Sequence, residues 1–205
     1  MNRVKQKFIV FFFVLFFGVF IQAQELNNTL HNAMQSVKSS LKNIVEATAI
    51  EIDRDANIAL KLLSSEINDS SLFIEQAYGY LIFPRVVKVG MGVGIETGEG
   101  VLRIDGSSAD YYRLSSGSLG FQIGAQAKAI VVAFMTEDIL NNFRNNPGWK
   151  VGVDGSITII DQGLGQSIDS DNILDPIIAF IFDSRGLMYS LTLEGTIFTL
   201  LDKSN

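Results

Sequence analysis

The chain has 205 residues, a formal net charge of −6 and no cysteine. Without cysteine the fold cannot depend on disulfides, and a thiol nucleophile or a thiolate metal site is excluded. The acidic balance, 22 acidic against 16 basic residues, argues against a nucleic-acid partner, because phosphate contacts need clustered Lys and Arg.

Residues 1–23 are predicted to be a signal peptide. Three basic residues precede an apolar run over residues 8–21, and Ala23 offers a small residue for cleavage. As a helix that run would reach only about 21 Å, against roughly 30 Å of hydrocarbon. We therefore expect an exported protein, periplasmic or extracellular and at most peripheral on a membrane. Losing three of the 16 basic residues leaves 13 against 22 acidic ones, a formal charge of −9.

Residues 24–77 are predicted to be helical. Apolar residues recur at spacings of three and four over 26–44, and again at Ala56, Leu60, Leu63 and Ile67. The polar cluster 68–70 separates these stripes from a short third helix that ends near Ala77.

The first of these helices is a candidate for membrane contact. Its apolar stripe could enter the membrane interface and place Lys38 and Lys42 beside lipid head groups. Packing of the same stripe against the rest of the protein is the alternative.

Residues 78–205 are predicted to form a glycine-rich β-domain, because 17 of the 18 glycines lie at or beyond Gly79 and apolar residues alternate with polar ones. One helix interrupts it at 137–144, where Thr136 can cap the first turn. The predicted strands are 78–83, 87–96, 99–104, 110–116, 118–126, 128–135, 150–160, 177–183, 186–194 and 196–201.

Tight turns between short strands favour antiparallel pairing. The predicted class is therefore α+β, with N-terminal helices packed on a mostly antiparallel sheet that is curved or closed into a barrel. Residues 24–205 are expected to be one structural unit.

The alternating glycines of Gly90–Gly94 do not predict a phosphate-binding loop. They lie in a strand context, and neither a helix start nor Lys-Ser/Thr follows them. Glycines two residues apart instead leave one face of a strand bare, so that a backbone, a large side chain or a ligand can approach.

Four ordered blocks resemble the SYLF domain family: AYGYLIFPRVVK over 77–88, GEGVL over 98–102, GSLGFQIGAQ over 117–126, and DSRGL with LEG over 183–187 and 193–195. The resemblance covers roughly residues 45–202. The family's motif positions are Gly79, Phe83, Pro84, Gly98, Gly100, Gly120, Gln122, Gly124, Gly186, Glu194 and Gly195.

The resemblance implies a function. Members of this family bind lipids, phosphoinositides in the eukaryotic cases, and some also bind actin filaments; bacterial relatives are exported. It implies an exported, non-catalytic lipid- or membrane-binding module that needs no cofactor and no metal.

A small basic patch is one hypothesis for the contact with lipid. Arg85 and Lys88 follow Pro84, and together with Arg103 and Lys128 they could meet an anionic head group. Ordinary surface charge is the alternative interpretation, since the sequence does not show whether these side chains converge.

Catalysis and metal binding have little support. The single histidine, His31, is predicted to be a solvated helix position, and the acidic loop at Asp169, Asp171 and Asp175 lacks the glycine and distal glutamate of an EF-hand. Glu194, predicted to lie in a strand, is either a buried acid or a carboxylate with ordinary polar partners.

Two other functions stay open. One is an envelope scaffold that contacts proteins through the bare glycine face and exposed aromatics at Tyr111 and Tyr112. The other is a hydrolase built on Asp and Glu side chains.

Overall fold

The computed structural model describes residues 47–161, 175–186 and 193–203, together with six isolated positions between 24 and 35. Residues 1–43 and 44–205 are separate compact units. In the first unit the described positions are helical and exposed, and His31 is among them, as predicted. The predicted signal peptide, Lys38 and Lys42 lie outside the described residues.

Within the described residues of the second unit, the helices α2 (Ala49–Glu66) and α3 (Ser70–Gln76) precede the sheet. Helix α2 starts with a capping box, in which the Thr48 hydroxyl accepts a hydrogen bond from the Glu51 N–H while the Glu51 carboxylate accepts one from the Thr48 N–H. The predicted stripe of Ala56, Leu63 and Ile67 is buried. A third helix, α4 (Glu137–Asn145), starts at the predicted cap Thr136.

Six of the predicted short strands are in fact two long ones, β1 (Gly79–Ile104) and β2 (Ser107–Phe134), which pair along their whole length. A two-residue turn at Asp105 and Gly106, with φ of 50° and 75°, joins them in the conformation that tight hairpins favour. The prediction of separate strands was wrong because Pro84 lies in a bulge of β1 and the glycines beyond it bend the strands without ending them.

The other strands are β3 (Gly148–Lys150), β4 (Thr158–Asp161), β5 (Ile177–Gly186) and β6 (Ile197–Leu201). Along its second edge β2 pairs with β6 near its start and with β5 near its end. Strand β3 lies beside β6, and β4 is parallel to β5. The predicted α+β class with a mostly antiparallel sheet is confirmed. Among the described strands no hydrogen-bonded ladder joins β1 to β3 or β4 to close the sheet.

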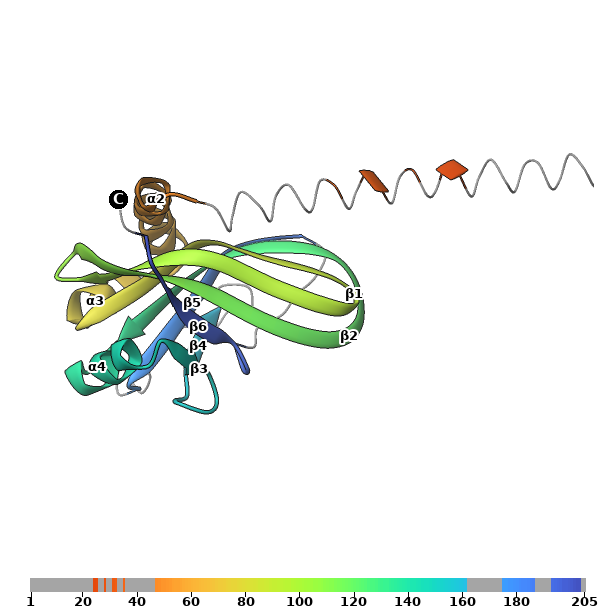
Figure 1. Ribbon diagram of the computed structural model, residues 1–205. Helices are drawn as coiled ribbons and strands as arrows, with labels where there is room; N and C mark the ends of the chain where they lie inside the picture. The colour runs from red at the N-terminus through yellow and green to blue at the C-terminus, as the bar shows by residue number, and fades with distance from the viewer. Residues whose placement is uncertain are drawn as a thin grey trace, which may run out of the picture. The chain divides into compact units, whose positions relative to one another are not determined.

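Strand β1 folds back on itself. A straight strand of 26 residues would be about 86 Å long. Instead, a Cβ added at Gly98 would lie 2.6 Å from the carbonyl oxygen of Arg85, and one added at Gly100 would collide with the carbonyl oxygen of Ile82. The β1–β2 pair is therefore a two-stranded ribbon folded into two layers, and Figure 1 shows both strands curving at one end.

The bend of this ribbon coincides with its glycines. Gly90 pairs with Gly124, and after Met91 the register shifts so that Gly92 pairs with Gly120. Two β2 residues, Phe121 and Gln122, have no partner in β1 at this point. Such a bulge bends the bulged strand and increases its twist. The family positions Gly120, Gln122 and Gly124 thus lie at the bend.

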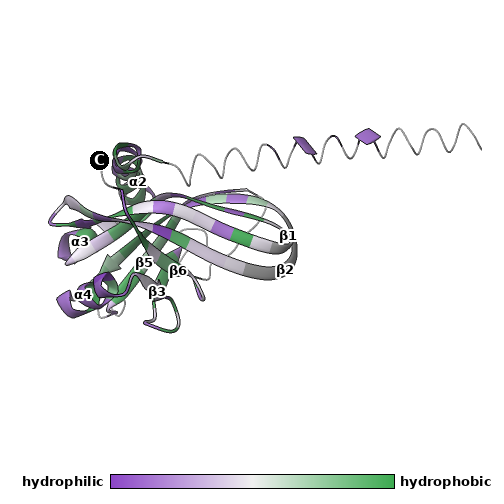
Figure 2. Cartoon of the chain, viewed as in Figure 1, coloured by the Kyte–Doolittle hydropathy of each residue, from purple (hydrophilic) through white to green (hydrophobic). Residues whose placement is uncertain are grey.

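Two apolar clusters hold the fold, one on each face of the ribbon. Figure 2 shows the hydropathy of each described residue along the ribbon. The inner core lies between the ribbon layers and against α4 and β6; it includes Phe83, Leu102, Leu114, Ile130, Phe143 and Phe198. The helix-side core joins α2 and α3 to the opposite face and includes Ala56, Leu63, Phe73, Ile82, Val131 and Phe180.

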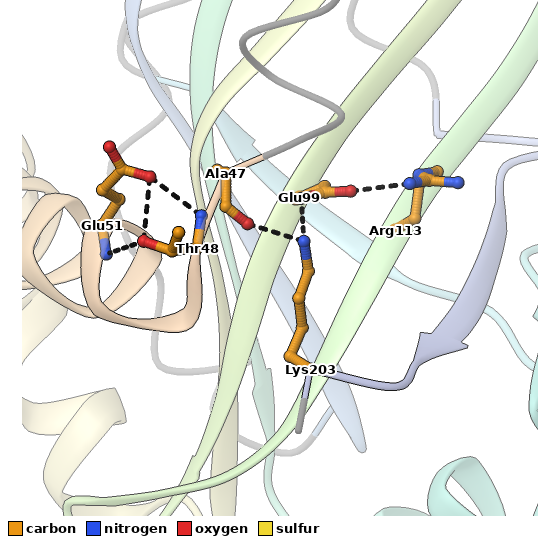
Figure 3. A network of polar contacts seen from close by, with 6 residues as sticks. All are labelled: Ala47, Thr48, Glu51, Glu99, Arg113 and Lys203. Carbon is orange, nitrogen blue, oxygen red and sulfur yellow. Dashed lines mark hydrogen bonds and ion pairs between the residues drawn. The ribbon is translucent and has the colours of Figure 1, made fainter. Parts of the chain in front are cut away.

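A buried carboxylate joins the start of α2 to the C-terminal end of the described chain. Glu99, 4% exposed, accepts hydrogen bonds from Arg113 at 2.7 Å and from Lys203 at 2.8 Å. The Lys203 ammonium also donates to the carbonyl oxygen of Ala47 at 2.6 Å, directly before the capping box (Figure 3). Charge-assisted bonds of this kind fix the start of α2 against the β-domain.

Two predictions about the C-terminal half were wrong. Residues 151–157 form a turn and an isolated bridge between β3 and β4, so that the predicted strand 150–160 exists only at its ends. Glu194 and Gly195 lie exposed in a turn before β6, where Gly195 has a φ of 75°. A short turn that buries every second residue shows the same alternation of apolar and polar residues as a strand. This similarity explains why both segments were predicted to be strands.

The folded ribbon predicts a large effect of one methyl group. Gly100→Ala would drive a Cβ into the backbone of Ile82, and overpacking of this kind typically costs about 1–3 kcal/mol or more. Gly117→Ala, with no atom within 4 Å of the added Cβ, is the matched control and should change the free energy of unfolding by less than about 0.5 kcal/mol. Urea unfolding measures both, and equal stabilities for the two variants would contradict the fold.

Candidate functional site

The space between the ribbon layers turns polar toward the bend. Lys128 and Gln126 alternate along β2 with Ile130, a residue of the inner core, and therefore face the same side. Lys88 is the direct partner of Gln126 on β1. All three polar side chains are buried, at 3%, 4% and 8% exposure for Lys128, Gln126 and Lys88. We call this region, together with Glu96, the polar interior.

An ion pair spans the two layers within the polar interior. The Lys128 ammonium lies 2.9 Å from a carboxylate oxygen of Glu96, and both side chains are at most 5% exposed. Lys128 pairs with Val86 in one layer, whereas Glu96 pairs with Ser116 in the other. At this depth each charge needs the other, because removing one partner leaves an uncompensated buried ion.

Lys88 has no such compensation. It is more than nine-tenths buried, yet among the described residues its ammonium has neither a hydrogen-bond acceptor nor an ion-pair partner. Gln126 beside it has a buried side-chain carbonyl oxygen with no hydrogen-bond donor. Of these two groups only the Gln126 oxygen is fully enclosed, and the Lys88 ammonium is not. An enclosed oxygen without a donor is costly, so this oxygen beside an unpaired cation indicates a place where an outside group can bind.

The predicted basic patch does not form. Of its four cations only Arg85 is exposed. Arg103 is buried against α2, where it donates to the side-chain oxygen of Asn57 at 2.8 Å and lies 3.7 Å from the Asp53 carboxylate. Lys88 and Lys128 are the two that the fold brings together, and it does so inside the ribbon.

The predicted exposed aromatics are also wrong. Tyr112 is 1% exposed and packs against Phe143 with ring centroids 4.9 Å apart, and burial, reinforced by the charge of Asp110, raises its pKa to about 12. Tyr111 is half-buried and donates to the Asp53 carboxylate at 2.7 Å; its pKa is raised, mainly by burial. Tyr112 is thus a core residue, and the hydroxyl of the half-buried Tyr111 is bound to α2.

The remaining family positions are structural. Phe83 is fully buried in the inner core, beside the bulge at Pro84. Gly79 leaves room for Leu140 of α4. Gly186, with a φ of 126°, allows β5 to approach the Ala125 backbone more closely than any side chain would permit.

Sequence reasoning missed Glu96 and Gln126. The alternation of side chains along a strand places both residues on the inner face of the ribbon. Alternation alone does not predict the fold-back that buries this face near the bend. The one available signal was the combination of charged residues and closely spaced glycines in adjacent strands.

The described residues contain neither a candidate metal site nor a candidate membrane-spanning helix. No three His, Asp or Glu side chains there converge in a way that could hold a metal ion. None of the helices described is both long enough and apolar enough to cross a membrane. Asp169 and Asp171 lie outside the described residues, and Asp175 is half-buried at the entry to β5.

The described β-domain is thus a glycine-bent ribbon with polar side chains between its two layers. A family model described as Ysc84, Las17-binding protein actin regulator, matches residues 115–205, from within β2 to the end of the chain. This match is consistent with a SYLF-type domain. It includes the predicted blocks 117–126, 183–187 and 193–195, whereas the blocks 77–88 and 98–102 lie before it. The chain matched none of the curated proteins.

The ion pair in the polar interior can be tested by a double-mutant cycle. Lys128→Met should lower the free energy of unfolding by about 3–5 kcal/mol because it leaves Glu96 charged and buried. Lys128→Met combined with Glu96→Leu should recover most of that loss, since both charges are then gone. Lys61→Met, at an exposed position of α2, is the control. Additive losses in the cycle would show that the two charges are not coupled.

Proposed function

We propose that the protein is an exported, non-catalytic lipid-binding module of SYLF type, whose glycine-bent end accepts a phospholipid head group. The observation that carries this proposal is the Lys88 ammonium, which has no partner among the described residues and lies on the residue paired with Gln126, whose enclosed oxygen lacks a donor. Together Lys88, Lys128 and Glu96 carry one net positive charge, so the polar interior favours an anionic group such as a phosphate.

The chemistry of the two unsatisfied groups narrows the head group. The Lys88 ammonium needs an acceptor, whereas the Gln126 carbonyl oxygen needs a donor. A phosphodiester that also carries a hydroxyl or an amine offers both, as in phosphatidylglycerol and phosphatidylethanolamine. Phosphatidylcholine offers the phosphate oxygens but no hydrogen-bond donor.

An exposed apolar residue lies beside this interior. Ile95 is 60% exposed and directly precedes Glu96 in β1, so that their side chains point to opposite faces of the ribbon. An isoleucine at such a place can enter the membrane interface while a head group binds inside.

Protein binding is a second candidate function. Ile50 and Ile58 are 76% and 53% exposed and lie eight residues apart, on one side of α2. The matching family is described by a protein partner and by actin regulation. In-cell crosslinking followed by identification of the captured proteins would separate this function from lipid binding.

Export can be tested on the full-length gene product. We expect the exported protein to begin at Gln24, and Val14→Arg to keep the uncleaved chain inside the cell because a charge interrupts the apolar run. Val153→Arg introduces the same charge at a position that is 72% exposed and should leave export unchanged. N-terminal sequencing of the exported and the retained protein identifies the first residue of each. Recovery of exported protein that still begins at Met1 would contradict cleavage.

Lipid binding can be tested by flotation with liposomes. The protein should float with vesicles that contain phosphatidylglycerol or phosphatidylethanolamine and should float poorly with phosphatidylcholine alone. Lys88→Gln should weaken binding about tenfold or more, the usual effect of losing a charge-assisted hydrogen bond. Lys61→Gln removes the same charge from the exposed side of α2 and should have little effect. No flotation with any of the three lipids, or equal effects of the two substitutions, would refute the proposal.

A further inference from the structure

A second pocket, which shares no residue with the polar interior, lies between α4, β3, the turn 151–157 and the entry to β5. Its volume is about 290 Å³, at the small end of ligand sites, which suits one ring-sized group. Five polar side chains line it: Asn142, Asp154, Ser156, Thr158 and Asp175.

Trp149 forms the buried wall of this pocket. It is 4% exposed and held by Phe143 and Phe198, with ring centroids 5.7 and 5.9 Å away. Within the described part of the chain its indole N–H has no hydrogen-bond partner, and it is not one of the fully enclosed polar atoms that lack one. The N–H therefore reaches open space. A donor of this kind, on a ring that cannot move, indicates a bound acceptor.

Gly155 keeps this edge of the indole uncovered. A Cβ at Gly155 would lie 2.7 Å from Trp149 Cζ2, on the side of the ring that carries the N–H. The hydrogen bonds that fix the turn include one from the Gly152 N–H to the Gly155 carbonyl oxygen at 2.8 Å and one from the Lys150 N–H to the Asp154 carboxylate at 2.7 Å. The pocket is thus formed before any ligand binds.

The polar groups define what would bind. The indole N–H can only donate, and the ionised carboxylates of Asp154 and Asp175 can only accept. A hydroxyl group does both. An organic cation would pair with the carboxylates and leave the indole N–H unpaired, whereas the two carboxylates would repel an anion.

We propose that this pocket binds a single sugar ring, with vicinal hydroxyls donating to the carboxylates and a ring or hydroxyl oxygen accepting from Trp149. The sugar can be free or can be the head group of a glycolipid. This inference does not rest on phospholipid binding by the polar interior, because the two sites share no residue.

The fluorescence of Trp149 tests the proposal directly, because it is the only tryptophan in the chain. The protein is titrated with glucose, galactose, mannose and N-acetylglucosamine, with ethanolamine and sulfate as a cation and an anion, and with vesicles with and without a galactosyl lipid. We expect a saturable change with at least one sugar or with the galactosyl vesicles only. No response to any sugar or galactosyl vesicle, or a response to ethanolamine or sulfate, would overturn the proposal.

Substitutions of pocket residues test whether the fluorescence response comes from sugar bound in this pocket. Asp175→Asn and Ser156→Ala should each weaken sugar binding about tenfold, since each removes a hydrogen-bond partner of a ligand hydroxyl. Gly155→Ala should abolish the response by filling the space beside the indole, with an unchanged circular dichroism spectrum as the check on folding. Val153→Ala, at an exposed position of the same turn, is the control. A sugar response that survives all three pocket variants would contradict the proposal, and a sugar response without phospholipid flotation would separate it from the lipid function.

Discussion

The β1–β2 ribbon can fold into two layers only because Gly98 and Gly100 have no side chains where β1 passes over its own backbone. Every other part of the β-domain depends on that contact. The fold-back encloses the inner core between the layers, and it leaves the second edge of β2 free to pair with β5 and β6. It also brings Glu96 within reach of Lys128, although the two residues are 32 positions apart.

The same fold-back buries polar side chains between the layers, which lowers the stability of the fold. Apolar side chains fill the space between the layers over most of their length. Near the bend, however, the Gln126 oxygen is enclosed without a donor, beside Lys88, whose ammonium has no partner among the described residues. A stability-optimised interior would not keep such groups. Their presence at the glycine-rich end, where backbone can bend and a ligand can approach, is the physical reason for assigning function to this end.

Local patterns in the sequence predicted much of the fold. The spacing of Ala56 and Leu63, the cap at Thr136 and the abundance of glycine after Gly79 gave the helices and the α+β class, because each depends on near neighbours. The long strands were not predictable in this way. Pro84 usually ends a strand, and only the tertiary contact of the two layers turns it into a bulge.

The candidate site was predicted only in part. Lys88 and Lys128 were selected by residue type, yet the fold places them inside the ribbon, while Arg103 belongs to the contact with α2. Charge and spacing do not show on which side of a folded sheet a residue lies. Gln126 carries no charge, and its role emerges only from its pairing with Lys88.

The most direct test of this account is a nuclear Overhauser contact between the Gly100 α-protons and the Phe83 ring protons. These residues belong to one strand and are 17 positions apart, so an extended hairpin would hold them far beyond the range of the effect. The folded ribbon predicts a strong cross-peak. Its absence in protein that otherwise shows the β1–β2 register would contradict the fold-back and the enclosed polar interior with it.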